Sequence, residues 1–340
     1  MKVAWERVTV ETVHPFRISR SVRTGDELVW VRIELEGIEG WGEADPSAYY
    51  GENASTVEAA LEKLAPRIAQ VDDPFRLDII ERDLHALIGR NGAVHSAVSS
   101  ALHDWVGKRV GLPLWKMWGL DPAEAPPSSF TIGIDEPESM AERAREARDR
   151  PILKIKLGSE DDETRLRAVR EAAPDKVLRV DANAAWTPRR AVEGIAMCAE
   201  YGVEFVEQPL PPARDAELAF VRARSSLPIF ADESSIVSSD LPRLVGLVDG
   251  INIKLAKCGG PREAIRMVNT ARALGFEVML GCMLETTLGI APAAHLAALV
   301  DYADLDGAAL LKTDPFEGPH LEGGRIVVDD TSGLGVSAKR

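Results

Sequence analysis

Three carboxylates stand at equivalent places in three successive segments of the chain. Asp181, Glu207 and Asp232 each follow a short apolar run, and they lie 26 and 25 residues apart, about one strand-and-helix repeat. In a (β/α)8 barrel the residues that follow the strands converge on one mouth. Three carboxylates there, with water and substrate completing an octahedron, suit Mg²⁺ better than Zn²⁺. One such residue could merely cap a helix, but three in register favour a metal site.

Lysines flank these carboxylates in the sequence. Lys154 and Lys156 alternate with apolar residues, so they share one face of a predicted strand. Lys254 ends another predicted strand, 22 residues after Asp232. A lysine with its ordinary pKa of about 10.4 acts as a base near neutral pH only when burial or a neighbouring cation lowers that pKa. A single lysine could extend from a strand end into solvent, but the grouping around a metal site favours proton transfer.

Length and composition limit the class of protein. The 340 residues are enough for a barrel of roughly 200–250 residues with a smaller companion domain. A net charge of −14 argues against a nucleic-acid-binding surface. Three cysteines do not suggest a disulfide framework, and no apolar run approaches the ~18 residues of a membrane helix. We therefore expect a cytoplasmic protein that binds neither nucleic acid nor membrane, and a homo-oligomer stays open.

The first third of the chain reads as a separate α+β module. Partial alternation of apolar residues in 8–13 and 28–35 predicts antiparallel strands, and the spacing changes to helical over 55–107. The proline-rich segment 121–127 breaks the helical pattern. We expect an N-terminal capping domain over residues 1–122.

After Pro127 the pattern becomes strand, loop and helix, repeated about every 25 residues. That repeat predicts an α/β fold with a (β/α)8-type, modified TIM barrel over residues 123–318. A C-terminal segment, 319–340, is expected to return to the capping domain. Eight strands are predicted: Ser129–Ile134, Leu153–Leu157, Val177–Val180, Val203–Val206, Ile229–Phe230, Gly250–Ile253, Val278–Leu280 and Ala303–Leu305.

The motifs that carry these residues resemble a known family. They are Lys154-Ile155-Lys156, Val180-Asp181-Ala182-Asn183, Val206-Glu207-Gln208-Pro209-Leu210, Ala231-Asp232-Glu233-Ser234 and Asn252-Ile253-Lys254. Over nearly the whole chain, the sequence resembles the muconate-lactonising subgroup of the enolase superfamily. The resemblance implies that the three carboxylates bind Mg²⁺. It also implies that Lys156 and Lys254 face opposite sides of the substrate, and that Lys154 helps to neutralise an enolate.

Within this subgroup, three further positions resemble dipeptide epimerases. The run 303–307 resembles an Asp-x-Asp motif in which Asp304 and Asp306 receive the α-ammonium group of a dipeptide, a pairing of opposite charges in a closed site. Both could instead cap the following helix. Cys282 matches a pocket-wall residue that is not a nucleophile. Thr131 matches a position beside the dipeptide, although strand threonines are usually structural.

The run 15–23 resembles the capping loop of members that accept L-Ala-D/L-Glu. The resemblance implies that its last residue, Arg23, meets the side-chain carboxylate of the substrate. Ser21 replaces the usual glycine and Val22 a small polar residue, which leaves acidic specificity open.

The expected function is Mg²⁺-dependent epimerisation of the C-terminal residue of a dipeptide such as L-Ala-D/L-Glu, in murein peptide metabolism. Two lysines would move the α-proton through an enediolate, whose charge must be stabilised as it forms. Within the subgroup, an o-succinylbenzoate synthase, an N-acylamino-acid racemase or a muconate cycloisomerase is the alternative. A non-catalytic binding barrel is the alternative from another class.

Overall fold

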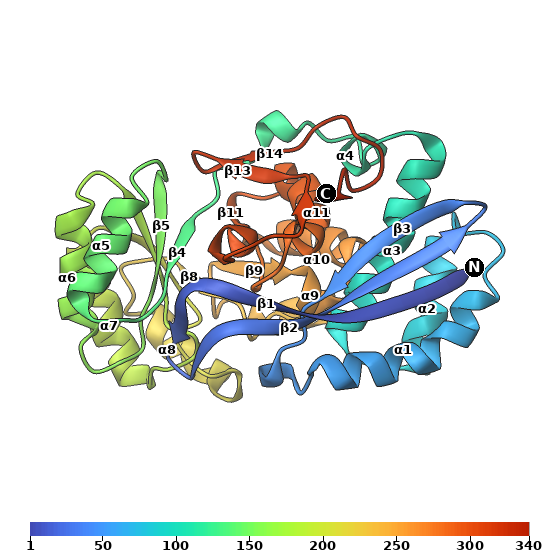
Figure 1. Cartoon of the computed structure of the whole chain (residues 1–340). Coiled ribbons are helices and arrows are strands. Elements are labelled where there is room, and N and C mark those ends of the chain that lie inside the picture. Colours follow the sequence, from blue (N-terminus) through green and yellow to red (C-terminus); the bar gives the residue numbers. More distant parts are fainter. Residues whose placement is uncertain (340) are drawn as a thin grey trace.

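The computed structural model describes residues 1–339. Its N-terminal part is a three-stranded antiparallel sheet, β1 (Lys2–Ile18), β2 (Ser21–Leu35) and β3 (Ile38–Ala44), covered by helices α1 (Ala54–Ala69), α2 (Leu77–Leu87) and α3 (Gly92–Val110). β1 and β2 form an unusually long hairpin of 17 and 15 residues. In Figure 1 this hairpin extends from the cap at the right across the molecule toward the barrel at the left.

The cap is held together by the helical face that the sequence predicts. Leu61, Leu64 and Ile68 of α1 are fully buried in one cluster with Val31 and Ile33 of β2. Burying such side chains contributes about 1.5–3 kcal/mol each. This cluster fixes the base of the hairpin, while its tip extends beyond the cap.

Helix α3 lies against β3 at close range. An added Cβ at Gly42 would lie 2.0 Å from the carbonyl oxygen of Ala97, and one at Gly40 would lie equally close to that of Ala101. Only glycine allows the two backbones to approach this closely. Nearly the whole of α3 is therefore buried, between the cap sheet and the barrel.

The second part confirms the expected α/β barrel. Eight parallel strands lie in the order β4 to β11, and Ser129 N donates to Ala303 O (3.0 Å) to join the first strand to the last. The strands are β4 (Phe130–Ile132), β5 (Ile152–Lys156), β6 (Val177–Asp181), β7 (Val203–Glu207), β8 (Ile229–Ala231), β9 (Gly250–Lys254), β10 (Glu277–Gly281) and β11 (Tyr302–Asp304). All eight predicted strands are found.

Helices connect these strands around the outside (Figure 1). The connecting α-helices are α5 (Pro137–Glu146), α6 (Asp162–Ala172), α7 (Pro188–Glu200), α8 (Leu218–Arg222), α9 (Leu255–Cys258), α10 (Pro261–Leu274) and α11 (Thr287–Leu296), whereas α4 (Leu114–Met117) precedes β4. The short 3-10 helices are η1 (Ala48–Tyr50), η2 (Pro122–Glu124), η3 (Pro212–Glu217), η4 (Ser238–Leu244), η5 (Ala297–Leu299) and η6 (Gly307–Leu310). Proline stands first in α5, α7 and α10, where its missing N–H costs no hydrogen bond.

The chain ends in short strands that contact both parts: β12 (Phe316–Glu317), β13 (His320–Glu322), β14 (Arg325–Val327) and β15 (Ser337–Ala338). The buried carboxylate of Asp104 in α3 accepts hydrogen bonds from Leu334 N (2.8 Å), Trp41 N (2.9 Å) and Lys108 Nζ (2.7 Å). It thereby joins the C-terminal segment to the cap. The domain boundaries at residues 122 and 318 stay a prediction.

A second buried acid joins the cap directly to the barrel. Glu43 of β3 accepts hydrogen bonds from Thr286 N (2.8 Å), beyond β10, and from Trp30 Nε1 (2.9 Å). Burial raises the pKa of Glu43 to about 8.

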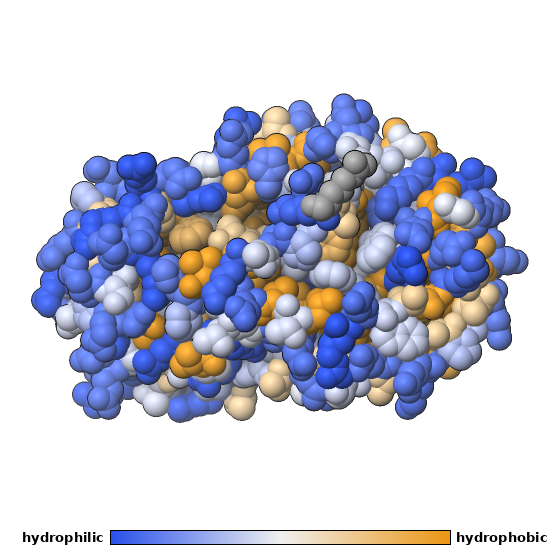
Figure 2. Space-filling model, in the orientation of Figure 1, coloured by the Kyte–Doolittle hydropathy of each residue, from blue (hydrophilic) through white to orange (hydrophobic). Residues whose placement is uncertain are grey.

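No helix within residues 1–339 is long and apolar enough to cross a membrane. Polar residues cover most of the face shown in Figure 2, with apolar side chains in scattered patches.

Candidate active site

The three carboxylates meet at the barrel mouth. Asp181 ends β6, Glu207 ends β7 and Asp232 directly follows β8. The parallel pairing sets Asp181 beside Glu207 and Glu207 beside Phe230, so the three carboxylates lie next to one another. One oxygen from each lies within 4.8 Å of the others, and all three side chains are at least 98% buried. Three adjacent strands thus bring together the carboxylates that the sequence selects.

The arrangement fits a divalent cation. Burial and the negative charge of Asp181, followed by that of Asp232, raise the pKa of Glu207 to about 7. Glu207 Oε1 accepts a hydrogen bond from Asn252 Nδ2 (2.8 Å), whereas Oε2 has Lys154 Nζ at 2.7 Å but no well-aligned hydrogen bond within residues 1–339. A cation between the three groups would relieve their repulsion, and an all-oxygen donor set suits Mg²⁺.

Lys156 and Lys254 reach this cluster from opposite ends of the row of strands. Lys156, on β5, places Nζ 2.6 Å from Asp181 Oδ2, and Lys254, on β9, places Nζ 2.9 Å from Asp232 Oδ2. Both line the same cavity. Burial alone would lower the pKa of Lys254, but the combined charges of Asp232, Glu207 and Asp181 outweigh burial, and the pKa lies above its ordinary value.

Lys154 lies deeper than expected for a group that touches substrate. Its Nζ is 2.7 Å from Glu207 Oε2 and 2.7 Å from Asp304 Oδ2, and its side chain is 1% exposed. It is not among the residues that line the cavity within residues 1–339. Strand alternation gives Lys154 and Lys156 the same face, but Lys154 stands two residues earlier and therefore lies below the mouth.

Asp304 and Asp306 line the cavity together with both lysines. Asp304 accepts hydrogen bonds from Ser129 Oγ (2.6 Å) and Lys154 Nζ (2.7 Å). Burial raises the pKa of Asp304, but the charges of Lys154 and Lys156 together with the hydrogen bonds to this carboxylate outweigh burial, leaving a pKa of about 2. Asp306 accepts from Thr131 N (2.6 Å), and burial together with the charge of Asp304 raises its pKa to about 6. These two carboxylates form an anionic wall, in which Thr131 orients Asp306.

Cys282 forms another part of the wall. Burial, followed by the charge of Asp306, raises the pKa of its thiol well above the ordinary value. A thiol with a raised pKa is a poor nucleophile. Cys282 thus lines the cavity beside the two aspartates with an uncharged thiol.

The tip of the β1–β2 hairpin closes the cavity from the cap side. Phe16, Ile18 and Arg23 line it, and the Arg23 guanidinium forms an ion pair with Asp26 on β2. The cavity encloses about 90 Å³. An acidic substrate side chain that approached Arg23 would therefore compete with Asp26.

Sequence reasoning missed several polar contacts of the site. Arg20 lines the cavity near Tyr50 and Asn183. Lys257, which the sequence does not mark as a site residue, is buried, and its Nζ donates to Asp232 O (2.6 Å) and also to Asp232 Oδ1. The Lys254-x-x-Lys257 spacing was the available signal, because the one-turn helix α9 brings both ammonium groups back to Asp232.

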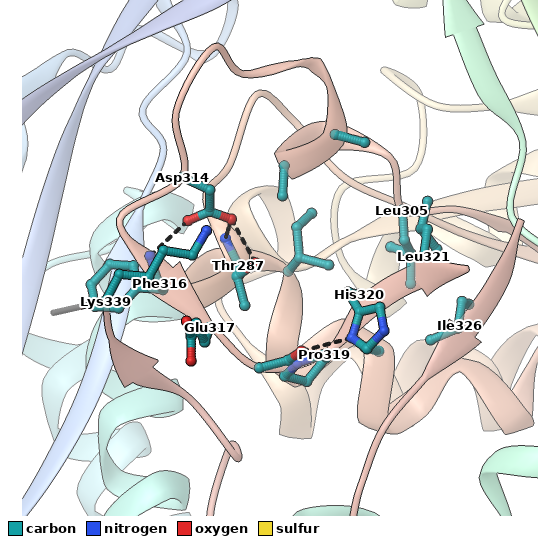
Figure 3. Close-up of a pocket in the computed structure, with 15 residues that line it drawn as sticks. Thr287, Leu305, Asp314, Phe316, Glu317, Pro319, His320, Leu321, Ile326 and Lys339 are labelled. Atoms are coloured by element: carbon teal, nitrogen blue, oxygen red, sulfur yellow. Dashed lines mark hydrogen bonds between the residues drawn. The ribbon is translucent and has the colours of Figure 1, made fainter. Parts of the chain in front are cut away.

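A larger cavity of about 470 Å³ lies elsewhere, between α11 and the C-terminal segment. Figure 3 shows Thr287 hydrogen-bonded to Asp314 at one side, with Phe316, Leu321 and Ile326 around the cavity. The three carboxylates and the two lysines at the barrel mouth do not line it. The cavity is mainly apolar and offers no comparable set of catalytic groups within residues 1–339.

Comparison with known proteins adds independent evidence. Residues 2–119 match the model for the mandelate racemase / muconate lactonizing enzyme N-terminal domain, and residues 139–340 match the enolase C-terminal domain-like model. The chain is 40% identical to an L-Ala-D/L-Glu epimerase of Bacteroides thetaiotaomicron, over 99% of this chain and 88% of that protein. It is 37% identical to a hydrophobic dipeptide epimerase of Enterococcus faecalis, over 93% of each.

Solved structures of dipeptide epimerases are also similar to this chain. A dipeptide epimerase from Enterococcus faecalis, complexed with Mg and the dipeptide L-Leu-L-Tyr, superposes with a TM-score of 0.94 at 36% identity and covers 99% of both chains. A substrate-liganded L-Ala-D/L-Glu epimerase from Bacillus subtilis gives a TM-score of 0.94 at 32% identity, again over 99% of both chains.

Proposed function

The chain belongs to the mandelate racemase / muconate lactonizing enzyme family of the enolase superfamily, and from this premise we propose that it is a Mg²⁺-dependent dipeptide epimerase. One observation carries the proposal. A single cavity has an anionic wall, Asp304 and Asp306, and two lysines beside a cluster of three metal-binding carboxylates. A dipeptide offers an ammonium group for the first and a carboxylate for the second.

The α-ammonium group distinguishes a dipeptide from the other substrates of the subgroup. It would pair with Asp304 and Asp306 through charge-assisted hydrogen bonds, which are about twice as strong as neutral ones. N-acylated amino acids and simple dicarboxylates have no such cation. The cavity-facing side of the two buried aspartates would then gain no charged partner from the substrate, and their desolvation by the bound ligand would be costly.

Lys156 and Lys254 perform the proton transfers. Asp181, Glu207 and Asp232 would hold Mg²⁺, whose positive charge would make the α-proton of the substrate more acidic and would favour the unprotonated form of a nearby lysine. The unprotonated Nζ of one lysine takes that proton, and the C–H electron pair is delocalised into the carboxylate. The opposite lysine donates a proton to the other face of the same carbon, which inverts its configuration.

The side chain of the epimerised residue would point toward the cap, where the hairpin tip supplies Arg23 and apolar groups. The relatives act on both acidic and hydrophobic dipeptides by name. Arg23 would recognise an acidic side chain of the substrate, and that side chain would compete with Asp26 for the guanidinium. The physiological setting that we propose is cytoplasmic metabolism of murein peptides.

A dipeptide library tests the function directly. Each dipeptide is incubated with enzyme and Mg²⁺ in D₂O, and deuterium uptake at the α-carbon of the C-terminal residue is followed by NMR. We expect uptake with inversion for a subset of dipeptides and none for their N-acetyl forms. Exchange of N-acylated amino acids in preference to free dipeptides would favour the racemase alternative, and ligand binding without any α-proton exchange would favour a binding barrel.

A further inference from the structure

Arg20, at the tip of the β1–β2 hairpin, contacts the barrel at two separate strand ends. Its Nη1 donates to the carbonyl oxygen of Asn183 (2.8 Å), beyond β6. Its Nη2 lies 2.8 Å from Glu233 Oε1, beyond β8. The guanidinium also stacks 4.3 Å from the ring centroid of Tyr49. A planar guanidinium can serve several acceptors at once because its donors are fixed in a fork.

Both contacts lie next to carboxylates of the metal cluster. Asn183 donates from its backbone N to Asp181 Oδ1 (2.7 Å) and from Nδ2 to Asp181 Oδ2 (3.0 Å). It does so in a left-handed backbone conformation, φ +45°, which is uncommon outside glycine. Glu233 directly follows Asp232. Arg20 therefore contacts one residue that hydrogen-bonds to Asp181 and one residue that adjoins Asp232 in the chain.

The contact between Arg20 and Glu233 involves a buried carboxylate. The Glu233 side chain is fully buried, and neither of its oxygens has a well-aligned hydrogen bond within residues 1–339. Arg20 Nη2, at 2.8 Å, supplies a positive charge beside this carboxylate. An uncompensated buried carboxylate is costly. Without Arg20, the loop that carries Asp232 would have to shift to bring Glu233 to water or to another donor.

We propose that Arg20 is a positioning residue that couples the hairpin tip to the arrangement of Asp181 and Asp232. A cation at the metal cluster fixes these two carboxylates, which fixes Asn183 and Glu233, and these hold the tip through Arg20. By reciprocity, an ordered tip favours cation binding by the same factor. The proposal shares only the metal site with the proposed function, so either can fail without the other.

Hydrogen exchange measures this coupling without any substrate. Amides in residues 16–25 of the whole enzyme are followed by mass spectrometry with and without Mn²⁺, and the dissociation constant of Mn²⁺ is measured separately by electron paramagnetic resonance. In the parent enzyme we expect Mn²⁺ to slow exchange at the tip by at least about 5-fold, the lower end of ordinary coupling factors. In Arg20→Ala we expect less than about 2-fold slowing with Mn²⁺ still saturating. A merely structural role would raise exchange equally with and without the ion.

Matched variants sharpen the result. Arg17→Ala removes an exposed arginine from the same tip that makes no ion pair within residues 1–339, and should keep the parental response. Glu233→Gln should abolish the response as Arg20→Ala does, and the double variant should be no worse than either single one, because coupled residues are not additive. Should Arg20→Ala not fold, Arg20→Lys keeps the charge and loses the fork, and should retain at most about half of the parental effect. A parental response in Arg20→Ala or Arg20→Lys, or additive effects in the double variant, would overturn the proposal.

Discussion

The barrel mouth and the hairpin tip face the same cavity but are built in opposite ways. At the mouth, the three metal-cluster carboxylates and the lysines beside them stand on or beside strands, are more than nine-tenths buried and are paired with opposite charges. At the tip, Arg20 and Arg23 stand at a reversal of the chain and keep about a third of their side-chain surface exposed. Rigid elements give precise geometry, whereas exposed loops tolerate change. We therefore expect the barrel to set the reaction and the recognition of the α-ammonium group, and the cap to select the side chain of the substrate.

The largest expected effect comes from removing one carboxylate at the mouth. Asp232→Asn or Glu207→Gln should lower epimerisation by at least about 10,000-fold, because several kcal/mol of charge stabilisation depends on the cation. Circular dichroism should show the parental fold. The rate of epimerisation is measured by NMR across a Mg²⁺ titration, with excess chelator on the parent enzyme as the reference. Full activity of the parent in chelator would remove the metal from the reaction.

The two lysines should separate the faces of the substrate. Lys254→Ala should lose net epimerisation by about 100- to 10,000-fold, while one epimer still exchanges its α-proton with D₂O through Lys156. Lys156→Ala should exchange the opposite epimer. Each pure epimer is followed by proton NMR in D₂O. Near-parental epimerisation in either single variant would contradict the two-base mechanism.

Asp306 tests the anionic wall, through both affinity and pH. Its pKa is raised to about 6, so below that pH it binds a proton and can no longer pair with the substrate ammonium. We expect kcat/KM for a dipeptide to fall as the pH drops through about 6, since kcat/KM reports groups of the free enzyme. Asp306→Asn should remove this acidic limb and cost about 3–5 kcal/mol at pH 8, as for breaking a buried pair. An unchanged acidic limb in Asp306→Asn would assign the ionisation to another group.

The residues of the barrel mouth could be predicted from the sequence because a few simple physical rules determine their positions. Parallel strands bring their ends to one rim, so spacing alone placed Asp181, Glu207 and Asp232 together. Alternation gave Lys156 its face, but it could not give depth, and Lys154 lies below the cavity as a partner of Asp304. The contact between Arg20 and Glu233 depends on how the cap docks on the barrel, which joins residues more than 200 positions apart. No local pattern encodes such a contact.

Arg23 gives the smallest expected effect and the sharpest test of the cap as the source of selectivity. Arg23→Ala should raise KM for L-Ala-L-Glu by the equivalent of about 1.5–3 kcal/mol, the value of a hydrogen bond to a charged group. It should change KM for L-Ala-L-Leu little, because an apolar side chain gains nothing from the guanidinium. Asp26→Asn should act in the opposite direction, since it releases Arg23 from its ion pair. Arg17→Ala serves as the control for removing a positive charge from the tip. Equal losses for both dipeptides in Arg23→Ala would mean that the tip only closes the cavity, and the selectivity would then have to come from the apolar residues Phe16 and Ile18.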